Sequence, residues 1–300
     1  MSRIKTSIIG LLVAAAALLG GCSSVRLAYG NGPQLAWWWL DSYVDFSTEQ
    51  APRVKEGIAN LFDWHRSSQL PAYATLLVTA QRQVLEATTP ELACRWQTQV
   101  RELLEPTLQR ALVLAAEQSP GLGEAQFKHM EQRYAKGMAE MRADFLQPDL
   151  VERQEKSVER AVERAERLYG RLAPVQLQVL RDGVQASPFD AALWLQERQR
   201  RQREVLGTLR RLAADKADAN QRLVAMRALA AQTEVSLNPT YRAYQLKLTD
   251  YNCALAARIH NAAPPAQRKQ ARETLKGWEE DLRALMARAT ATATATAPPA

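Results

Sequence analysis

Apolar residues recur along most of the chain at the spacing of one face of an α-helix. The segment VRELLEPTLQRALVLAAEQ is an example, with apolar side chains three or four residues apart from Val100 to Leu112. No stretch of strand length alternates between apolar and polar residues. Pairs such as Thr89–Pro90 and Asn238–Pro239 are typical of helix starts, where proline costs no hydrogen bond. We therefore expect an all-α array or bundle of about eight to ten helices without a sheet.

The first segment differs from this pattern because it has the features of an export signal. Arg3 and Lys5 precede an apolar run over residues 8–19, which is short for a permanent membrane span. The run ends in Leu-Gly-Gly-Cys, which resembles the lipobox of bacterial lipoproteins. That resemblance implies a signal peptide at residues 1–21 and acylation of Cys22, which becomes the first residue. A plain secretory signal that happens to contain a cysteine is the alternative.

The lipobox also suggests where the protein resides and how its domain is attached. Ser23 follows the cysteine, and the lipoprotein sorting rule associates serine there with the outer membrane, so we expect an anchor facing the periplasm. Residues 22–33 are then a lipidated tether. Residues 34–288 form a single helical domain, and the Ala/Thr/Pro-rich residues 289–300 are a disordered tail because they lack core-forming side chains.

The charge of the chain excludes one class of partner and suggests another. The formal net charge is +7, and removal of Arg3 and Lys5 leaves about +5, which is no signature of nucleic-acid binding. Glutamate and arginine alternate over DLVERQEKSVERAVERAERLYGRL, where pairs three and four residues apart are expected to stabilise an exposed helix. The next helix is basic, with arginines at six positions: Arg198, Arg200, Arg201, Arg203, Arg210 and Arg211. They either bind a polyanion such as lipopolysaccharide or peptidoglycan, or form a solvated face paired with Glu197 and Glu204.

Two cysteines remain after lipidation of the first. Cys94 and Cys253 both lie on predicted helices among apolar neighbours, and an exported protein can form disulfides. We predict that they pair and close a loop of about 160 residues, which excludes Cα atoms more than about 7 Å apart. Two separate buried thiols are the alternative. We expect neither a metal nor a cofactor, because no histidine follows either cysteine at ligand spacing.

Three consecutive tryptophans, Trp37 to Trp39, lie near the predicted anchor. On a helix they point about 100° apart, so they cannot all face one core. Trp37 belongs to an apolar stripe with Leu40 and Val44. We expect all three indoles to pack between neighbouring helices, with insertion of Trp38 or Trp39 into the lipid head-group layer as the alternative.

The block WLDSYVDFSTEQAPRVKEGIANLFDWHRSSQLPAYATLL resembles the N-terminal signature of a family of proteobacterial lipoproteins of unknown function. The residues that carry the resemblance are Trp39, Asp41, Tyr43, Gln50, Trp64, His65, Arg66, Leu70, Pro71, Tyr73 and Ala74. The resemblance implies a lipid anchor and a helical fold. It implies no activity, because the family has none established.

The Trp64–His65–Arg66 run within this block allows three interpretations. It is the positively charged end of a helix at a corner before Pro71, a binding site, or a catalytic site. In the catalytic interpretation His65 is a general base, oriented by a nearby carboxylate. The three carboxylates considered are Asp41, Glu49 and Asp63. We expect no enzyme, because the sequence contains no nucleophile, metal or cofactor motif.

Two helix starts, LAPVQLQVL and APPAQRKQARETL, partly resemble the L-T-P-x-Q segments of Spy- and CpxP-like periplasmic chaperones. Ala173 and Pro264 replace the threonine. The first hypothesis is therefore a lipid-anchored interaction or chaperone-like protein of the cell envelope. The second is a hydrolase or transferase that acts on an envelope polymer through His65, and the third is a polyanion-binding protein that uses the arginine helix.

Overall fold

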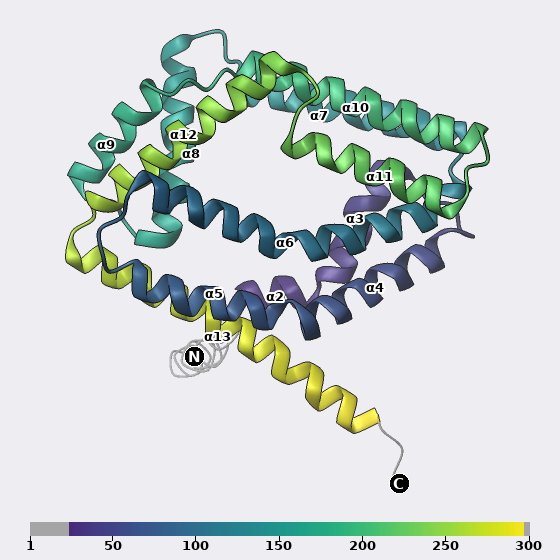
Figure 1. Ribbon diagram of the computed structural model, residues 1–300, viewed down its shortest axis with the longest axis horizontal. Helices are drawn as coiled ribbons and strands as arrows, with labels where there is room; N and C mark the ends of the chain where they lie inside the picture. The colour runs from purple at the N-terminus through teal and green to yellow at the C-terminus, as the bar shows by residue number, and fades with distance from the viewer. Residues whose placement is uncertain (1–23, 297–300) are drawn as a thin grey trace, which may run out of the picture.

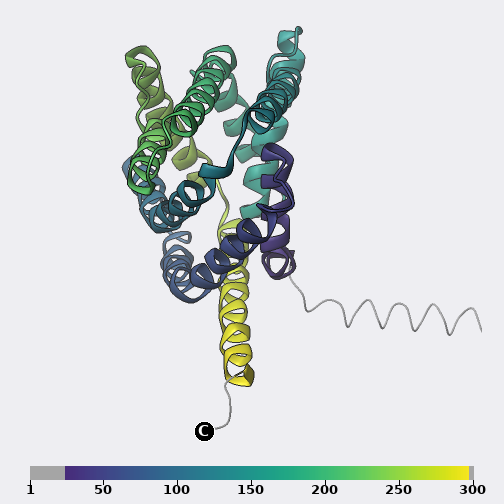
Figure 2. The same ribbon diagram turned by 90° about the vertical axis from the view of Figure 1, so that its right-hand side faces the viewer.

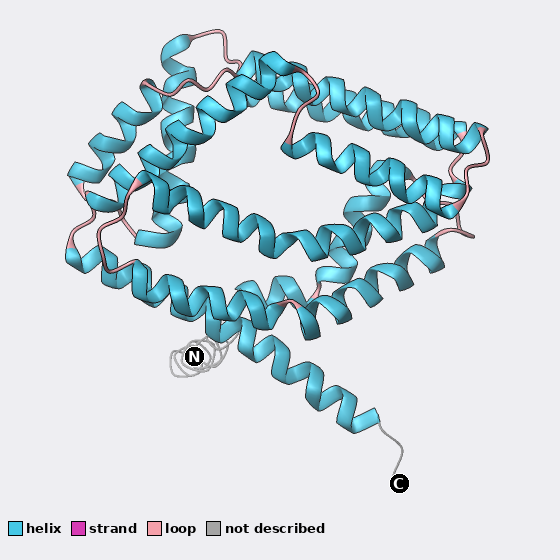
Figure 3. Cartoon of the chain, viewed as in Figure 1, coloured by secondary structure: helices cyan, strands magenta, loops and turns pink. Residues whose placement is uncertain are grey.

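The computed structural model describes residues 24–296, with side chains described from residue 25 to residue 287. The expected signal peptide and Cys22 lie outside this range. The described residues form twelve α-helices and a short 3₁₀-helix, with no strand among them (Figure 3). The elements are α2 (Ser24–Gly30), α3 (Gly32–Val44), α4 (Ala51–Ser68), α5 (Leu70–Gln83), α6 (Pro90–Gln118), η2 (Ser119–Gly121), α7 (Glu124–Phe145), α8 (Leu150–Tyr169), α9 (Pro174–Gln185), α10 (Ala191–Ala214), α11 (Ala219–Glu234), α12 (Pro239–Asn261) and α13 (Pro265–Thr296). The all-α prediction is confirmed, and the number of helices is slightly higher than expected.

Side chains with an acceptor oxygen define many of the helix starts. Thr89 accepts the backbone N–H of Leu92 at the start of α6, and Asn238 accepts two backbone N–H groups at the start of α12. Asp149 and Asp190 cap α8 and α10 in the same way. Such a cap satisfies an N–H group that has no partner inside the helix, which explains why each helix begins there.

The helices form an open, ring-like arrangement in projection (Figure 1). α4 and α5 follow one another along one side, α7 and α10 lie together on the opposite side, and α13 packs most extensively against α5. The end of α13 projects from the other helices in both views (Figures 1 and 2). The side chains are buried in three separate clusters, so no single centre organises the fold.

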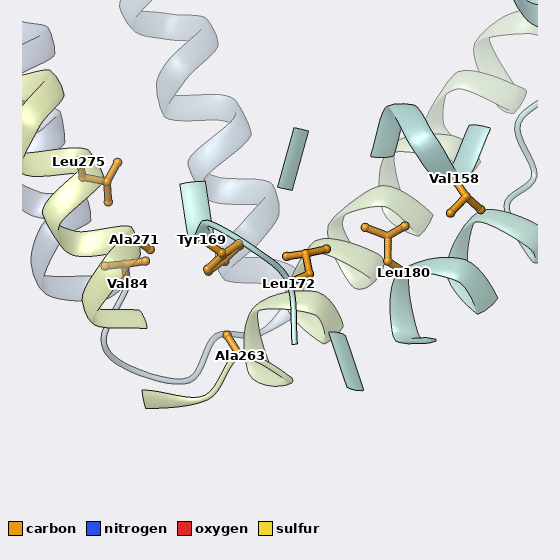
Figure 4. Packing of buried hydrophobic residues seen from close by; sticks show 8 residues of the cluster. All are labelled: Val84, Val158, Tyr169, Leu172, Leu180, Ala263, Ala271 and Leu275. Atoms are coloured by element: carbon orange, nitrogen blue, oxygen red, sulfur yellow. The ribbon is translucent and has the colours of Figure 1, made fainter. Parts of the chain in front are cut away.

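The largest of these clusters joins elements that are distant in sequence. It contains Val84 after α5, Tyr169 at the end of α8, Leu180 on α9 and Ala271 on α13 (Figure 4). Leu180 is 1% exposed and Ala271 is fully buried. Each large apolar side chain buried in this way contributes about 1.5–3 kcal/mol to stability.

A disulfide joins Cys94 on α6 to Cys253 on α12, and their Cα atoms are 5.3 Å apart. That distance lies within the limit set from the sequence. The bond crosslinks an N-terminal helix to the penultimate one, across a sequence separation of 159 residues.

The predicted tether differs from what is found in the described residues. Residues 24–30 form α2 and α3 begins at Gly32, so most of the predicted tether is helical and belongs to the folded domain. Two contacts hold α2 in place: Arg26 pairs with Asp281 of α13 at 2.9 Å, and the Tyr29 hydroxyl lies 2.8 Å from Nδ1 of His65. Both partners are remote in sequence, which is why local composition did not reveal the helix.

The expected environments of the tryptophans and of the C-terminal segment also need correction. Trp37 is 8% exposed, whereas Trp38 and Trp39 are 60% and 63% exposed, so only one of the three indoles packs inside. α13 continues to Thr296, beyond the predicted start of the tail at residue 289. Alanine, which alternates with threonine there, is a strong helix former and favours this continuation.

Candidate functional site

His65 lies at the corner between α4 and α5, in the last turn of α4. Its Nδ1 atom is 2.8 Å from the Tyr29 hydroxyl, and its Nε2 atom is 3.3 Å from the Tyr73 hydroxyl. The Tyr73 hydroxyl in turn lies 3.2 Å from Oγ1 of Thr107. The half-buried imidazole therefore connects α2, α4, α5 and α6 through a line of hydroxyl groups.

The environment of His65 favours its neutral form. Burial lowers the pKa of His65, and burial also raises the pKa of Tyr29 to about 12, so both groups stay uncharged near neutral pH. A neutral imidazole has one nitrogen that donates and one that accepts, and a hydroxyl group can serve either of them. Hydrogen bonding thus fixes the ring without an ionic partner.

None of the three carboxylates considered as a partner for His65 contacts its ring. Asp41 Oδ1 accepts the backbone N–H of Phe46 at 3.0 Å. Glu49 accepts the hydroxyls of its neighbours Ser47 and Thr48, and Asp63 is exposed and lies 4.0 Å from Arg66. The catalytic interpretation, in which one of these carboxylates orients His65, therefore finds no such contact in this structure.

The side chains on either side of His65 point to different surroundings. The Arg66 guanidinium lies 5.6 Å from the ring centre of Tyr29, on the α2 side. Trp64 faces α6, where the Arg110 guanidinium lies 4.9 Å from its ring centre. Trp64 and Arg110 line a cleft of about 510 Å³ between α4 and α6. Trp64 thus contacts α6, whereas His65 and Arg66 both contact Tyr29 of α2.

Two other signature residues, Gln50 and Tyr43, lie at or before the opposite end of α4. Gln50 donates to the backbone carbonyl of Gly121 at 2.6 Å and accepts from Gln126 at 2.9 Å, which ties α4 to η2 and α7. Tyr43 packs against Tyr134 of α7, with ring centres 6.0 Å apart. At 1.5 Å per residue, the fifteen residues from Gln50 to His65 span about 22 Å. The signature therefore marks two structural corners.

The arginines of α10 take part in an internal polar network. Glu197 is 3% exposed and accepts hydrogen bonds from Arg200 at 2.9 Å, Arg201 at 3.0 Å and Ser236 at 2.7 Å. Arg200 also pairs with Glu204 at 2.6 Å. The hydrogen bonds from Arg200, with those from Ser236 and Arg201, lower the pKa of Glu197 to about 2, so this carboxylate is charged over the whole neutral range.

The remaining arginines of α10 do not form one free cationic row. Arg210 pairs with Glu124 at 2.9 Å and Glu131 at 2.7 Å, both on α7, and Arg211 donates to Thr208 at 3.0 Å. Arg198 and Arg203 are exposed. Three of the six predicted polyanion ligands, Arg200, Arg201 and Arg210, are thus committed to carboxylates of the protein itself.

A larger cleft of about 720 Å³ lies where α8, α9, α10 and α12 meet the end of α7, and the sequence analysis did not identify it. We call it the α8 cleft. Arg153, Arg160 and Arg164 line one part of it, and Phe145, Phe189 and Trp194 line another. The feature of the sequence that could have indicated this cleft is the spacing of the arginines, because positions 153, 160 and 164 fall on one face of a helix.

Within the described residues, no group of three or more His, Cys, Asp or Glu side chains is arranged to hold a metal ion. The surface instead contains two clefts that combine aromatic rings with guanidinium groups, one beside Trp64 and the other at α8.

Comparison with known proteins places these features in a family. The model of a family of unknown function, DUF6279, matches residues 42–242, from α3 to the start of α12, and includes both corners and most of the α8 cleft. No curated protein and no solved structure matches the chain. Since the match covers more than half of the sequence, the chain belongs to this family of unknown function, DUF6279.

Proposed function

We propose that this protein is a lipid-anchored interaction protein of the cell envelope, held on the outer membrane by an acylated Cys22. The exposed apolar side chains of α2 and α3, which we call the α2–α3 face, rest on the lipid surface. The lipobox-like Leu-Gly-Gly-Cys sequence supports the anchor. Cys22 lies two residues before the start of α2, so an acyl chain on it is necessarily close to this face.

The observation that carries the proposal is a set of exposed apolar side chains on α2 and α3. Leu27 is 65% exposed, Leu35 46%, Trp38 60% and Trp39 63%. Leu27, Leu35 and Trp38 line a single shallow depression. Exposing several large apolar groups together is unfavourable in water, and an indole combines an apolar ring with a polar N–H that suits the head-group layer.

The proposal concerns attachment to the membrane surface by lipid and side chains. Among the helices of residues 24–296, none is long and apolar enough to cross a bilayer. Lipid attachment usually needs a second contribution for stable binding, because a single acyl chain binds only marginally. The α2–α3 face supplies such a contribution next to the anchor.

A binding role receives more support than catalysis through His65. Both ring nitrogens of His65 are engaged by tyrosine hydroxyls, and the carboxylates near it in sequence serve other partners. Polyanion binding through α10 also receives less support, since Arg200 and Arg210 are held by internal carboxylates. On this basis the partner is bound at the clefts and is held near the membrane by the anchor.

Vesicle binding tests the proposal. The mature chain with Cys22→Ser carries no acyl group, so its binding to vesicles measures the contribution of the side chains alone. It is mixed with vesicles of phosphatidylethanolamine and phosphatidylglycerol, and bound protein is separated by flotation. We expect Trp38→Ser/Trp39→Ser to lower the partition coefficient by about tenfold, which corresponds to roughly 1.4 kcal/mol of lost apolar burial. Leu246→Ser is the matched control, since Leu246 is 64% exposed on α12.

Two outcomes contradict the proposal. One is equal partition of the tryptophan variant and the control. The other is an envelope protein whose Cys22 carries no lipid when the exported chain is analysed by mass spectrometry. For the partner, crosslinking in intact envelopes followed by purification is expected to recover a specific component, and a client-protection assay tests a chaperone-like role.

A further inference from the structure

We propose that the α8 cleft binds a single-chain anionic amphiphile, with the alkyl chain on its aromatic wall and the anionic head group at its arginines. This inference names a ligand site and does not depend on the membrane anchor.

The cationic wall is formed by one face of α8. Arg153 donates to the backbone carbonyl of Gln147, and Arg160 donates to the carbonyl of Asp144 at 2.9 Å and to the Ser157 hydroxyl at 3.1 Å. These partners are neutral, so they orient the guanidinium groups without cancelling their charge. Among the described residues, no carboxylate oxygen lies within 4.0 Å of the nitrogens of Arg153, Arg160 or Arg164.

The arginines also act on one another. Arg160 is half-buried, and burial together with the nearby charge of Arg164 lowers its pKa, while the carboxylates of Asp144 and Glu159 act on it in the opposite direction. A guanidinium group stays protonated despite such a shift, so the positive charge persists. An anion placed between Arg160 and Arg164 would relieve this repulsion and receive charge-assisted hydrogen bonds.

The carboxylates around the cleft do not neutralise this wall. Asp190 is the one acidic residue that lines the cleft, and its carboxylate caps α10 by accepting the backbone N–H of Leu193 at 2.9 Å. Glu152, Glu155 and Glu159 of α8 are exposed and do not line the cleft. Glu159 pairs with Lys156 at 2.8 Å. Three arginines against one aspartate leave the lining of the cleft with a net positive charge. Asp144 and Glu159, which do not line it, offset part of the charge of Arg160.

The aromatic wall supplies the apolar part of the site. Phe145 and Trp194 have ring centres 5.1 Å apart, and Phe189 lies 6.1 Å from Trp194. The Arg160 guanidinium lies 4.4 Å from the centre of the Phe145 ring, so the cationic and apolar walls meet at this point. Leu150, which is 67% exposed, extends the apolar wall at the start of α8.

The size of the cleft selects one small ligand. Its volume of about 720 Å³ lies within the range of sites that hold single small molecules. An apolar wall next to unneutralised arginines complements an alkyl chain that carries one carboxylate or phosphate. Neither a neutral nor a cationic amphiphile would satisfy both walls.

Calorimetry on the mature chain with Cys22→Ser tests this inference. The probes are dodecanoate and dodecyl phosphate, used below their micelle-forming concentrations, with dodecyl maltoside and dodecyltrimethylammonium as neutral and cationic counterparts. We expect one anion to bind per chain, and the counterparts to bind at least about tenfold more weakly. Binding of the carboxylate alone indicates a fatty acid, binding of the phosphate alone indicates a lipid phosphate, and either result supports the site.

Matched variants locate the binding in the cleft. Arg164→Gln is expected to weaken anion binding by about tenfold, whereas Arg167→Gln, which removes an equal charge from an exposed position of α8 outside the cleft, is expected to leave it unchanged. Leu150→Asn is expected to weaken binding of the alkyl chain. Its control is Val151→Asn, since Val151 is 63% exposed and does not line the cleft.

Circular dichroism and the urea midpoint establish that each variant is folded. Equal binding of neutral, cationic and anionic probes overturns the inference. Equal effects of Arg164→Gln and Arg167→Gln also overturn it, because they indicate a response to net charge alone. Bound ligand should in addition change the fluorescence of the wild-type chain but not that of Trp194→Phe, and the same change in both chains contradicts the location.

Discussion

Replacement of Glu197 by glutamine tests whether the buried network of α10 stabilises the fold through charge. Glu197 is 3% exposed and accepts hydrogen bonds from Arg200, Arg201 and Ser236. Glu197→Gln keeps the shape of the side chain and removes its charge. Arg200 and Arg201 then lose their shared carboxylate, and Arg200 retains only its pair with Glu204, which costs stability.

The magnitude follows from the pKa of Glu197, which is lowered from 4.5 to about 2, first of all by the hydrogen bonds from Arg200. A shift of this size corresponds to about 3 kcal/mol of stability at pH 7. Because the folded pKa is the lower one, the unfolded state binds more protons between pH 4.5 and 2. This contribution is therefore complete above pH 4.5 and is lost as the pH falls toward 2.

Urea unfolding of the wild type and Glu197→Gln at pH 7 and pH 3 measures both effects. We expect the variant to be less stable by about 3 kcal/mol at pH 7 and by about 1 kcal/mol at pH 3. Groups that titrate in both proteins cancel in this difference. Glu159→Gln is the control, because Glu159 forms only an exposed pair with Lys156 and its loss should not be measurable. A difference for Glu197→Gln that is the same at both pH values refutes the reasoning.

Three further predictions concern other parts of the fold. Burial lowers the pKa of His65, so the unfolded state binds more protons below about pH 6.5 and the free energy of unfolding should fall from pH 7 to pH 5. His65→Gln should reduce this pH dependence in urea unfolding. An unchanged pH dependence contradicts the lowered pKa of His65. Reduction of the Cys94–Cys253 disulfide, which spans 159 residues, should lower stability by about 5 kcal/mol, and free thiols in the exported protein would refute the pairing. Gly183→Ala should destabilise the fold by roughly 1–3 kcal/mol in thermal unfolding, because the added Cβ would overlap Cδ1 of Leu255. Gly137→Ala, whose Cβ would meet no neighbouring atom, should be neutral or stabilising. Equal effects of the two variants contradict the predicted overlap.

Local pattern was sufficient to predict the helices and many of their boundaries. Val54 and Ile58 lie four residues apart, and so on one face of α4, and they are 1% and 4% exposed. Thr89 and Asn238 cap the helices that they were expected to begin. Such features depend on neighbours within one turn, so the sequence displays them directly.

Contacts between distant segments could not be predicted in this way. Arg26 of α2 pairs with Asp281 of α13, and one of the two hydroxyl partners of His65 is Tyr29, in a segment interpreted as a tether. The family signature was equally ambiguous, because the pattern does not distinguish residues that brace corners from residues that bind a ligand. Gln50 and His65 occur at opposite ends of one helix.

The two arginine-rich helices show why charge composition alone gave the wrong emphasis. On α10, Arg200 lies three residues after Glu197 and four before Glu204, and both spacings bring the carboxylates to its own side of the helix. On α8 we expected repeated pairs between glutamate and arginine, yet Lys156–Glu159 is the ion pair found within the described helix. Arg153 and Arg160 bind backbone carbonyls at the end of α7 instead. Backbone carbonyls direct a guanidinium group without neutralising it, so Arg153 and Arg160 of α8 keep their charge beside the aromatic rings of the α8 cleft, whereas Arg200, Arg201 and Arg210 of the more basic α10 are paired with carboxylates.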